Sequence, residues 1–230
     1  AKTDYLIAIG NQVKDDLLAV GIGKADQYRT FFPGLPEPVT GTVAECRSAL
    51  GLDPNKTYCT FVGRLTQIKR PDRLLDVAAA VVARGVDLHF LVAGEGELLE
   101  ASKARALAEG LPVTFLGWRK DVARLFAASD IAILTSDNEG IPLTLIQAAQ
   151  AGLPIVAPKV GSISDIVIDG ETGFLTSPQP GAMASALSAL VTDLDLRDNL
   201  GMAGRAHAHK YFSLAKSLED HATLYEFSQN

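Results

Sequence analysis

Residues 135–158 have the sequence TSDNEGIPLTLIQAAQAGLPIVAP, and this stretch decides the fold class of the chain. The apolar run just before it, at 130–134, has the length and composition of a buried strand. Residues 135–140 are polar and include a glycine, so they predict the loop that ends this strand.

Pro142 stands where a helix would begin, because the first helical turn tolerates a residue without an amide hydrogen. Residues 143–151 are rich in helix formers, and Gly152 followed by Pro154 stops the helix. A second buried strand is predicted directly afterwards, at 153–157. A strand, a loop, a helix and a strand in such close succession are typical of an α/β protein.

The same alternation extends over most of the chain. We predict six buried strands, at 58–63, 87–93, 112–116, 130–134, 153–157 and 174–175. Helices are predicted between them at 71–84, 96–109, 121–128 and 143–151, and after the last strand at 182–192, 196–208 and 214–227. The predicted fold is a doubly wound parallel six-stranded Rossmann-like sheet with extra C-terminal helices.

The N-terminal segment does not fit this sheet. Residues 5–9 predict a strand and 12–20 a helix, and a lone β-α unit without partner strands cannot bury its faces. We expect it to be the tail of a preceding domain, followed by a Pro- and Gly-rich linker at 27–38. The expected organisation is a remnant plus linker, the main sheet domain and a terminal helix, at 1–38, 39–212 and 213–230.

Composition excludes several classes of function. The net charge of −6 and the pI of about 5.2 make nucleic acid or an anionic membrane surface an unfavourable partner. No apolar run reaches the length of a membrane span, and no signal-peptide pattern is present. Cys46 and Cys59 have no metal-ligand spacing, so we expect a reducing cytoplasm and no metal site.

Topology predicts where a ligand binds. In the strand order 3-2-1-4-5-6, ligands bind where the winding direction reverses, between the loops at 63–69 and 135–140. This arrangement brings Arg64 and Lys69 opposite Glu139 and the helix N-terminus near Pro142. Two cations facing a helix N-terminus would suit a diphosphate. Two solvated surface cations and an ordinary strand-loop-helix unit remain the alternatives.

The glycines do not form a dinucleotide fingerprint. The strand at 58–63 is followed by GRLTQIKR rather than G-x-G-x-x-G, and there is no P-loop. The Gly-Glu-Gly sequence at 94–96 is more consistent with a tight turn. Residues 161–165 could add amides and hydroxyls to the same mouth or form a plain turn, and the D-x-D at 193–195 is better explained by helix capping.

Four segments together resemble a known family. They are FVGRLTQIKR at 61–70, FLGWRKDVARLFAASDIAILTS at 115–136, NEGIPLTLIQAAQAGLPIVA at 138–157 and GSISDIVIDGETGFL at 161–175. Their order and spacing resemble the C-terminal, donor-binding half of a GT-B glycosyltransferase of retaining family 4 (glycosyl transferases group 1). The resemblance covers about 4–227 and implies that 39–212 is a nucleotide-sugar donor domain. It also implies that 1–38 ends an N-terminal domain and that 213–230 is a helix crossing back to it.

The resemblance also implies roles for single residues. Arg64 and Lys69 would grip the donor diphosphate, with Gly63 in the same motif, and Glu139 would contact the transferred sugar. Trp118 and Arg119 would lie near the base. The segment of Gly140, Ile141, Pro142 and Leu143 would meet sugar and phosphate.

Gln147 departs from the family pattern, which has a second glutamate at this position that usually binds the ribose hydroxyls. A glutamine can still donate and accept hydrogen bonds there, but without charge assistance. We therefore expect Gln147 to affect the affinity for the donor rather than the identity of the family.

The implied activity is transfer of a sugar from a nucleotide diphosphate sugar, preferentially a UDP-sugar, to an acceptor hydroxyl with retention. No metal or cofactor is expected. A saccharide or lipid-linked acceptor would bind through the missing N-terminal domain, so the fragment alone would be inactive. Such an enzyme would serve polysaccharide or glycoconjugate biosynthesis in the cytoplasm or at the inner membrane face.

Three alternatives remain open. An epimerase of the same fold would release free nucleotide and sugar without an acceptor, and a phosphorylase is the second enzymatic alternative. A non-catalytic nucleotide-binding module would bind without turnover.

Overall fold

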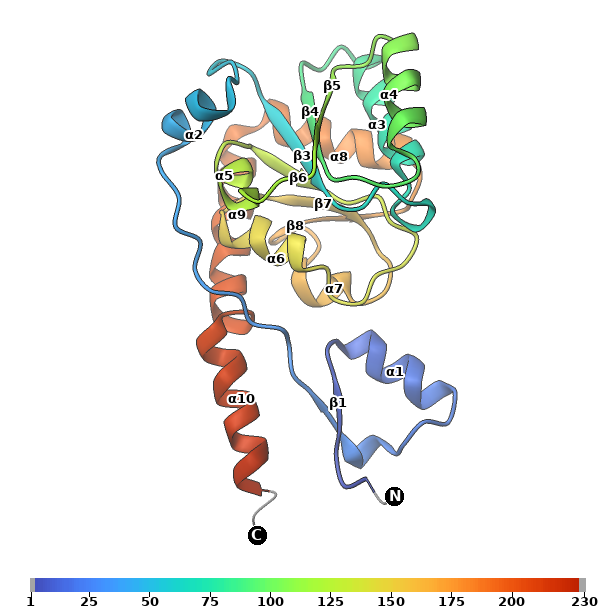
Figure 1. Ribbon diagram of the computed structural model, residues 1–230, viewed down its shortest axis with the longest axis vertical. Coiled ribbons are helices and arrows are strands. Elements are labelled where there is room, and N and C mark those ends of the chain that lie inside the picture. Colours follow the sequence, from blue (N-terminus) through green and yellow to red (C-terminus); the bar gives the residue numbers. More distant parts are fainter. Residues whose placement is uncertain (1–2, 228–230) are drawn as a thin grey trace.

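The computed structural model describes residues 3–227, and its main body is a six-stranded parallel sheet (Figure 1). The strand order is β5-β4-β3-β6-β7-β8, which confirms the predicted order 3-2-1-4-5-6. The strands are β3 (Tyr58–Val62), β4 (His89–Ala93), β5 (Val113–Gly117), β6 (Ile131–Ile133), β7 (Ile155–Pro158) and β8 (Gly173–Thr176).

Helices cover both faces of the sheet. On one face, α3 (Pro71–Val82) packs against α4 (Leu99–Ala108) and α8 (Pro180–Thr192). On the other, α5 (Val122–Ala127) packs against α2 (Val43–Leu50) and α6 (Leu143–Gln150). The helix α9 (Leu194–Tyr211) contacts both α6 and α8.

The helix α3 illustrates how sequence dictates this packing. Pro71 is its first residue, where a missing amide hydrogen costs nothing. Leu74, Val77, Ala78 and Val81 follow the i, i+3, i+4, i+7 pattern of an amphipathic helix, and all four are buried against the sheet. Burial of each larger side chain stabilises the fold by roughly 1.5–3 kcal/mol.

The N-terminal segment corrects one prediction. The strand β1 (Leu6–Ala8) precedes α1 (Asn11–Ala19) as expected, but β1 is not alone, because it pairs in parallel with β2 (Tyr28–Thr30). The strand β2 lies inside the segment predicted as a linker at 27–38. The strand β2 has only three residues, and the Pro and Gly residues directly after it favour the interpretation as a linker.

Two α-helices were not predicted either. The helix α2 begins with a capping box in which Thr42 and Glu45 bond reciprocally, and the sequence T-x-x-E was a readable signal for it. The helix α7 (Ile163–Ile166) is a single turn within the segment interpreted as a loop or turn. No helix in the described range is long and apolar enough to cross a membrane.

The chain crosses itself at the junction between α9 and α10 (Leu214–Phe227). The Leu35 amide donates to the Phe212 carbonyl at 2.9 Å, and the Leu214 amide donates to the Leu35 carbonyl at 3.0 Å. Below this junction, α10 and the β1–β2 unit extend away from the sheet (Figure 1). The predicted bounds 1–38, 39–212 and 213–230 stay predictions, and residues 1–2 and 228–230 lie outside the described part.

The β1–β2 unit contacts the main body through the N-terminus of α1. The Asp165 carboxylate accepts hydrogen bonds from the Asn11 amide and from the Asn11 side chain, both at 2.8 Å. It therefore caps α1 from another part of the chain, because the N-cap residue Gly10 has no side chain to do so. Gly10 also lies so close to Ser162 and Ile141 that a Cβ atom would overlap the Ser162 hydroxyl.

Asp165→Ala should therefore loosen α1 without unfolding the sheet. Loss of a cap costs about 1 kcal/mol, which corresponds to roughly fivefold faster local opening. Amide hydrogen exchange across 11–19 should accelerate by that factor, whereas exchange in β3 and β4 should not change. Asp15→Ala, on the exposed surface of α1, is the control, and equal exchange in the two variants would contradict the capping role.

Candidate functional site

A cavity of about 560 Å³ opens at the carboxyl ends of β3, β4 and β5. It brings together four of the predicted site residues, Gly63, Arg64, Trp118 and Arg119, from loops that are far apart in the sequence. The remaining lining residues are Val62, Ala93, Gly94, Glu95, Gly96 and Val122. The cavity lies at the carboxyl edge of the sheet, where α/β proteins bind ligands. It is lined from the loops after β3, β4 and β5, however, and no residue of the predicted loop at 135–140 lines it.

The glycines after β4 do more than form a turn. A Cβ atom on Gly94 would overlap the Gly63 carbonyl, and one on Gly96 would overlap the Leu65 carbonyl. Their φ angles of +143° and +158° are also unfavourable for any other residue. The two glycines thus let two backbones meet at the cavity, a role that the interpretation as a tight turn missed.

Arg64 differs from the other cavity cation in having no partner. Arg119 donates to both carboxylate oxygens of Asp121, at 2.8 and 2.6 Å, and this hydrogen bonding raises its pKa. Arg64 is exposed and makes no hydrogen bond or ion pair with any described residue. Arg64 is therefore free to bind an anion in this cavity.

Trp118 offers an aromatic surface at the same place. The residue is 63% exposed although tryptophan is usually largely buried, and the Lys120 ammonium lies 5.8 Å from the ring centre. An exposed aromatic ring at the lip of a cavity is suited to stack on a planar ligand.

Lys69 and Glu139 form a second, more buried group. Their side chains are 19% and 9% exposed and make an ion pair, and the Ser136 hydroxyl donates to the same Glu139 oxygen at 2.5 Å. The structure thus brings Lys69 to Glu139, as predicted. Arg64 lies instead with Trp118, and no contact between Arg64 and Glu139 occurs among the described residues.

The start of α6 provides free backbone donors beside Glu139. Pro142 is its N-cap, and within the described chain the amides of Gly140, Ile141 and Leu143 have no protein acceptor. The Glu139 carbonyl accepts from the Ser162 amide at 3.2 Å, and Gly161 approaches it so closely that a Cβ would overlap it. Residues 161–162 therefore support this loop, and the expectation that they add amides and hydroxyls to a ligand site stays a prediction.

Gln147 lies apart from these groups. It lines a smaller cavity of about 190 Å³ with Gln150, residues 35–38 and α5. Neighbouring residues of α5, Val122 and Ala123, line the larger and the smaller cavity respectively. Asp193, by contrast, accepts from the Leu196 amide at 2.9 Å, so it caps α9 as expected.

Comparison with known proteins shows the family of this chain. A family model described as glycosyl transferases group 1 matches residues 56–193. The curated relatives include D-inositol 3-phosphate glycosyltransferase of Rhodococcus jostii, 31% identical over 92% of this chain and 50% of the relative. The protein of that name from Mycobacterium sp. (strain JLS) is 40% identical over 76% of this chain and 41% of the relative. The chain spans about half the length of the curated relatives it matches.

Solved structures share the fold. Sucrose-phosphate synthase from Thermosynechococcus elongatus superposes with a TM-score of 0.86 at 25% identity, covering 100% of this chain and 60% of that one. The Anabaena protein HepE, solved in complex with UDP, has a TM-score of 0.88 at 23% identity, covering 97% and 64%. With the family model matching well over half of its residues, the chain belongs to the glycosyl transferases group 1 family.

Proposed function

We propose that this chain is the donor-binding half of a glycosyltransferase that transfers a sugar from a nucleotide diphosphate sugar to an acceptor hydroxyl. The observation that carries the proposal is the pairing of an unpartnered Arg64 and an exposed Trp118 in one cavity. A phosphate binds an arginine fork well, and a base stacks on an aromatic ring. HepE was solved with UDP, which supports a UDP-sugar as the donor.

Each group then has a role. Trp118 and Arg119 bind the base, and Arg64 and Lys69 bind the diphosphate together with the amides at the start of α6. Glu139 binds hydroxyls of the transferred sugar. Gln147 binds the ribose, which would have to reach toward the smaller cavity beside α5.

The reaction develops negative charge on the β-phosphate as the sugar leaves. Arg64, Lys69 and the N-terminus of α6 are the donors that would stabilise this charge. We propose that these groups suffice without a metal ion and that the sugar is transferred with retention of configuration.

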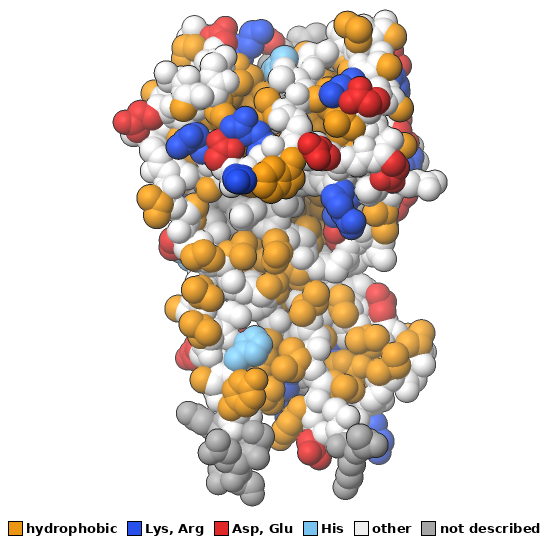
Figure 2. All heavy atoms as spheres, viewed as in Figure 1, with side chains coloured by type: hydrophobic (Ala, Val, Ile, Leu, Met, Phe, Trp, Pro, Cys, Tyr) orange, Lys and Arg blue, Asp and Glu red, His pale blue; other side chains and the backbone are white. Residues whose placement is uncertain are grey.

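We further propose that the acceptor binds through chain that precedes β1, and that the fragment alone binds the donor without transferring sugar. The relatives are about twice as long. Hydrophobic side chains gather on the lower half of the molecule, over α10 and the β1–β2 unit (Figure 2). Exposed residues there include Tyr5, Ile7, Ile9, Leu214 and Leu218, a surface that a further domain would cover. The buried free thiols of Cys46 and Cys59 support a cytoplasmic location.

The test uses Trp118, which is the only tryptophan in the chain. Titration with UDP should quench its fluorescence with saturation, whereas uridine should bind far more weakly because it lacks the diphosphate. An unchanged spectrum, together with no heat of binding by calorimetry for UDP, ADP or GDP, would overturn the proposed function.

Arg64→Ala should weaken UDP binding by about 1.5–3 kcal/mol, the range for hydrogen bonds to charged groups. This corresponds to roughly tenfold or more in the dissociation constant. Calorimetry should show no comparable loss for uridine. Lys103→Ala, which removes the same charge from the exposed surface of α4, is the control. Equal losses for UDP and uridine would contradict the phosphate role.

A further inference from the structure

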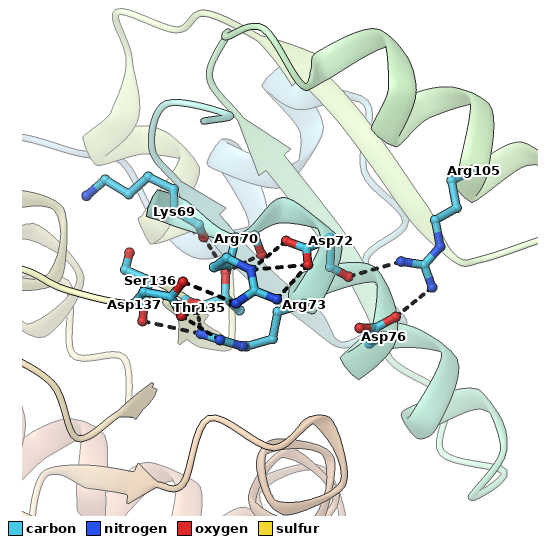
Figure 3. Close-up of polar contacts among 9 residues, drawn as sticks. All are labelled: Lys69, Arg70, Asp72, Arg73, Asp76, Arg105, Thr135, Ser136 and Asp137. Carbon is cyan, nitrogen blue, oxygen red and sulfur yellow. Dashed lines mark hydrogen bonds and ion pairs between the residues drawn. The ribbon is translucent and has the colours of Figure 1, made fainter. Parts of the chain in front are cut away.

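The loop that carries Glu139 has no regular secondary structure, yet Arg73 holds it firmly (Figure 3). Arg73 lies in the first turn of α3, and its side chain is only 8% exposed. Its guanidinium donates to the Thr135 carbonyl and to the Asp137 carboxylate, both at 2.6 Å. One side chain thus fixes both the backbone and a carboxylate of the loop.

Arg70 fixes the same carboxylate from a second direction. It donates to Asp137 at 3.1 Å, and it also forks onto Asp72 at 2.9 and 2.7 Å. The hydrogen bonds from Arg73 and Arg70 lower the pKa of the Asp137 carboxyl, so it stays charged. Arg70 has φ +53°, the only positive φ at a non-glycine residue in the described range. Its backbone therefore adopts an unfavourable conformation in the geometry that makes these contacts.

Backbone contacts reinforce the connection between the two loops. The Asp137 amide donates to the Ile68 carbonyl at 2.9 Å, and the Thr135 hydroxyl donates to the Lys69 carbonyl at 2.8 Å. The loop bearing Lys69 and the loop bearing Glu139 are therefore held at a fixed separation.

Both groups that contact the Glu139 carboxylate belong to this arrangement. Lys69 directly precedes Arg70, and Ser136 lies between Thr135 and Asp137. A change in the side-chain contacts of Asp137 would displace the neighbouring Ser136, and with it the carboxylate of Glu139, whereas Lys69 belongs to the other loop.

We propose that Arg70, Arg73 and Asp137 are positioning residues, which set the Glu139 carboxylate at the place where it receives the sugar of the donor. This inference rests on the proposed function. The family resemblance gives these three charged residues no role. We assign them a contribution to sugar binding rather than to nucleotide binding.

The helix α3, which carries Arg73, also provides a matched control. Arg105 of α4 donates to Asp76 of α3 at 2.6 Å, the distance of the Arg73–Asp137 pair, but Asp76 does not contact the loop at 135–140 (Figure 3). If the Asp137 contacts were only structural, Asp137→Asn and Asp76→Asn would have the same kind of effect.

The experiment measures the affinities for UDP and UDP-glucose by calorimetry. Asp137→Asn should weaken UDP-glucose binding about tenfold and leave UDP binding within about twofold of the wild type. Asp76→Asn should change neither affinity. Asp137→Glu, which keeps the carboxylate, should recover part of the loss. Circular dichroism checks that each variant is folded.

The decisive step is a double-mutant cycle with Glu139→Gln. If Asp137 acts through Glu139, Asp137→Asn should cause no further loss of UDP-glucose affinity in the Glu139→Gln background. Additive losses, or equal losses for UDP and UDP-glucose, would overturn the positioning role. So would an Asp137→Asn variant that binds UDP-glucose like the wild type. UDP binding by the wild-type chain tests the proposed function separately, so the two can fail independently.

Discussion

Gly94→Ala should be among the most destabilising single substitutions in this chain. The added Cβ would overlap the Gly63 carbonyl, and φ +143° is a conformation that alanine avoids. Backbone strain and overpacking each cost about 1–3 kcal/mol, so we expect a loss of roughly 4 kcal/mol. For a chain of this size the melting temperature should fall by roughly 10 °C. UDP binding should fall as well, because the backbone segments at 63–64 and 94–96 together form one wall of the cavity.

Gly110→Ala separates the two causes. Gly110 also has a positive φ, +61°, but a Cβ there would meet no atom within 4 Å. Only the conformational penalty applies, so we expect a loss of about 1 kcal/mol and unchanged UDP affinity. Similar losses for both variants in thermal unfolding would show that close backbone approach at Gly94 is unimportant.

The second large effect is expected for Lys69→Met. This change leaves the Glu139 carboxylate, only 9% exposed, without its cation. Removing one partner of a buried ion pair costs about 3–5 kcal/mol, and we expect the lower end because 19% of the Lys69 side chain still reaches solvent. Urea unfolding should report this loss as a lower midpoint with an unchanged slope.

Adding Glu139→Gln to Lys69→Met should restore much of the lost stability, since it removes the unpaired charge and keeps an acceptor for Ser136. The double variant should thus be more stable than Lys69→Met alone, although it lacks both charges. If it proves less stable than either single variant, the interaction between Lys69 and Glu139 is not the one described.

The alternation of apolar runs and helix formers was enough to predict the sheet, because parallel strands buried on both faces must be continuously apolar. Short elements escaped prediction because a periodic pattern needs several residues to be recognised. Residues 28–30 of β2 and 163–166 of α7 are too few to show a period. The capping box at Thr42 is readable in the sequence, but an eight-residue helix without a strong apolar stripe has too weak a period to be predicted from its pattern.

The predicted topology correctly brought Lys69 close to Glu139, but it wrongly brought Arg64 there as well. The reason lies in Leu65, which is fully buried and whose amide donates to the Glu95 carbonyl at 2.9 Å. This bond draws the first part of the loop toward β4 and Trp118, whereas Lys69 continues toward Thr135. The Arg73–Asp137 contact was equally invisible, because a charged residue in the first turn of a helix is ordinarily solvated.

The chain crossing at Leu35 brings the two ends of the Rossmann-like unit together. The backbone enters the Rossmann-like unit at Leu35 and leaves it at Phe212, and one hydrogen bond of 2.9 Å joins these two points. The ends of the unit are therefore already adjacent, so joining them would cost little chain entropy. Residues 35–212 therefore form a unit that can be excised, circularised or grafted into another chain as one insert. Modules with adjacent ends tolerate such transfers best.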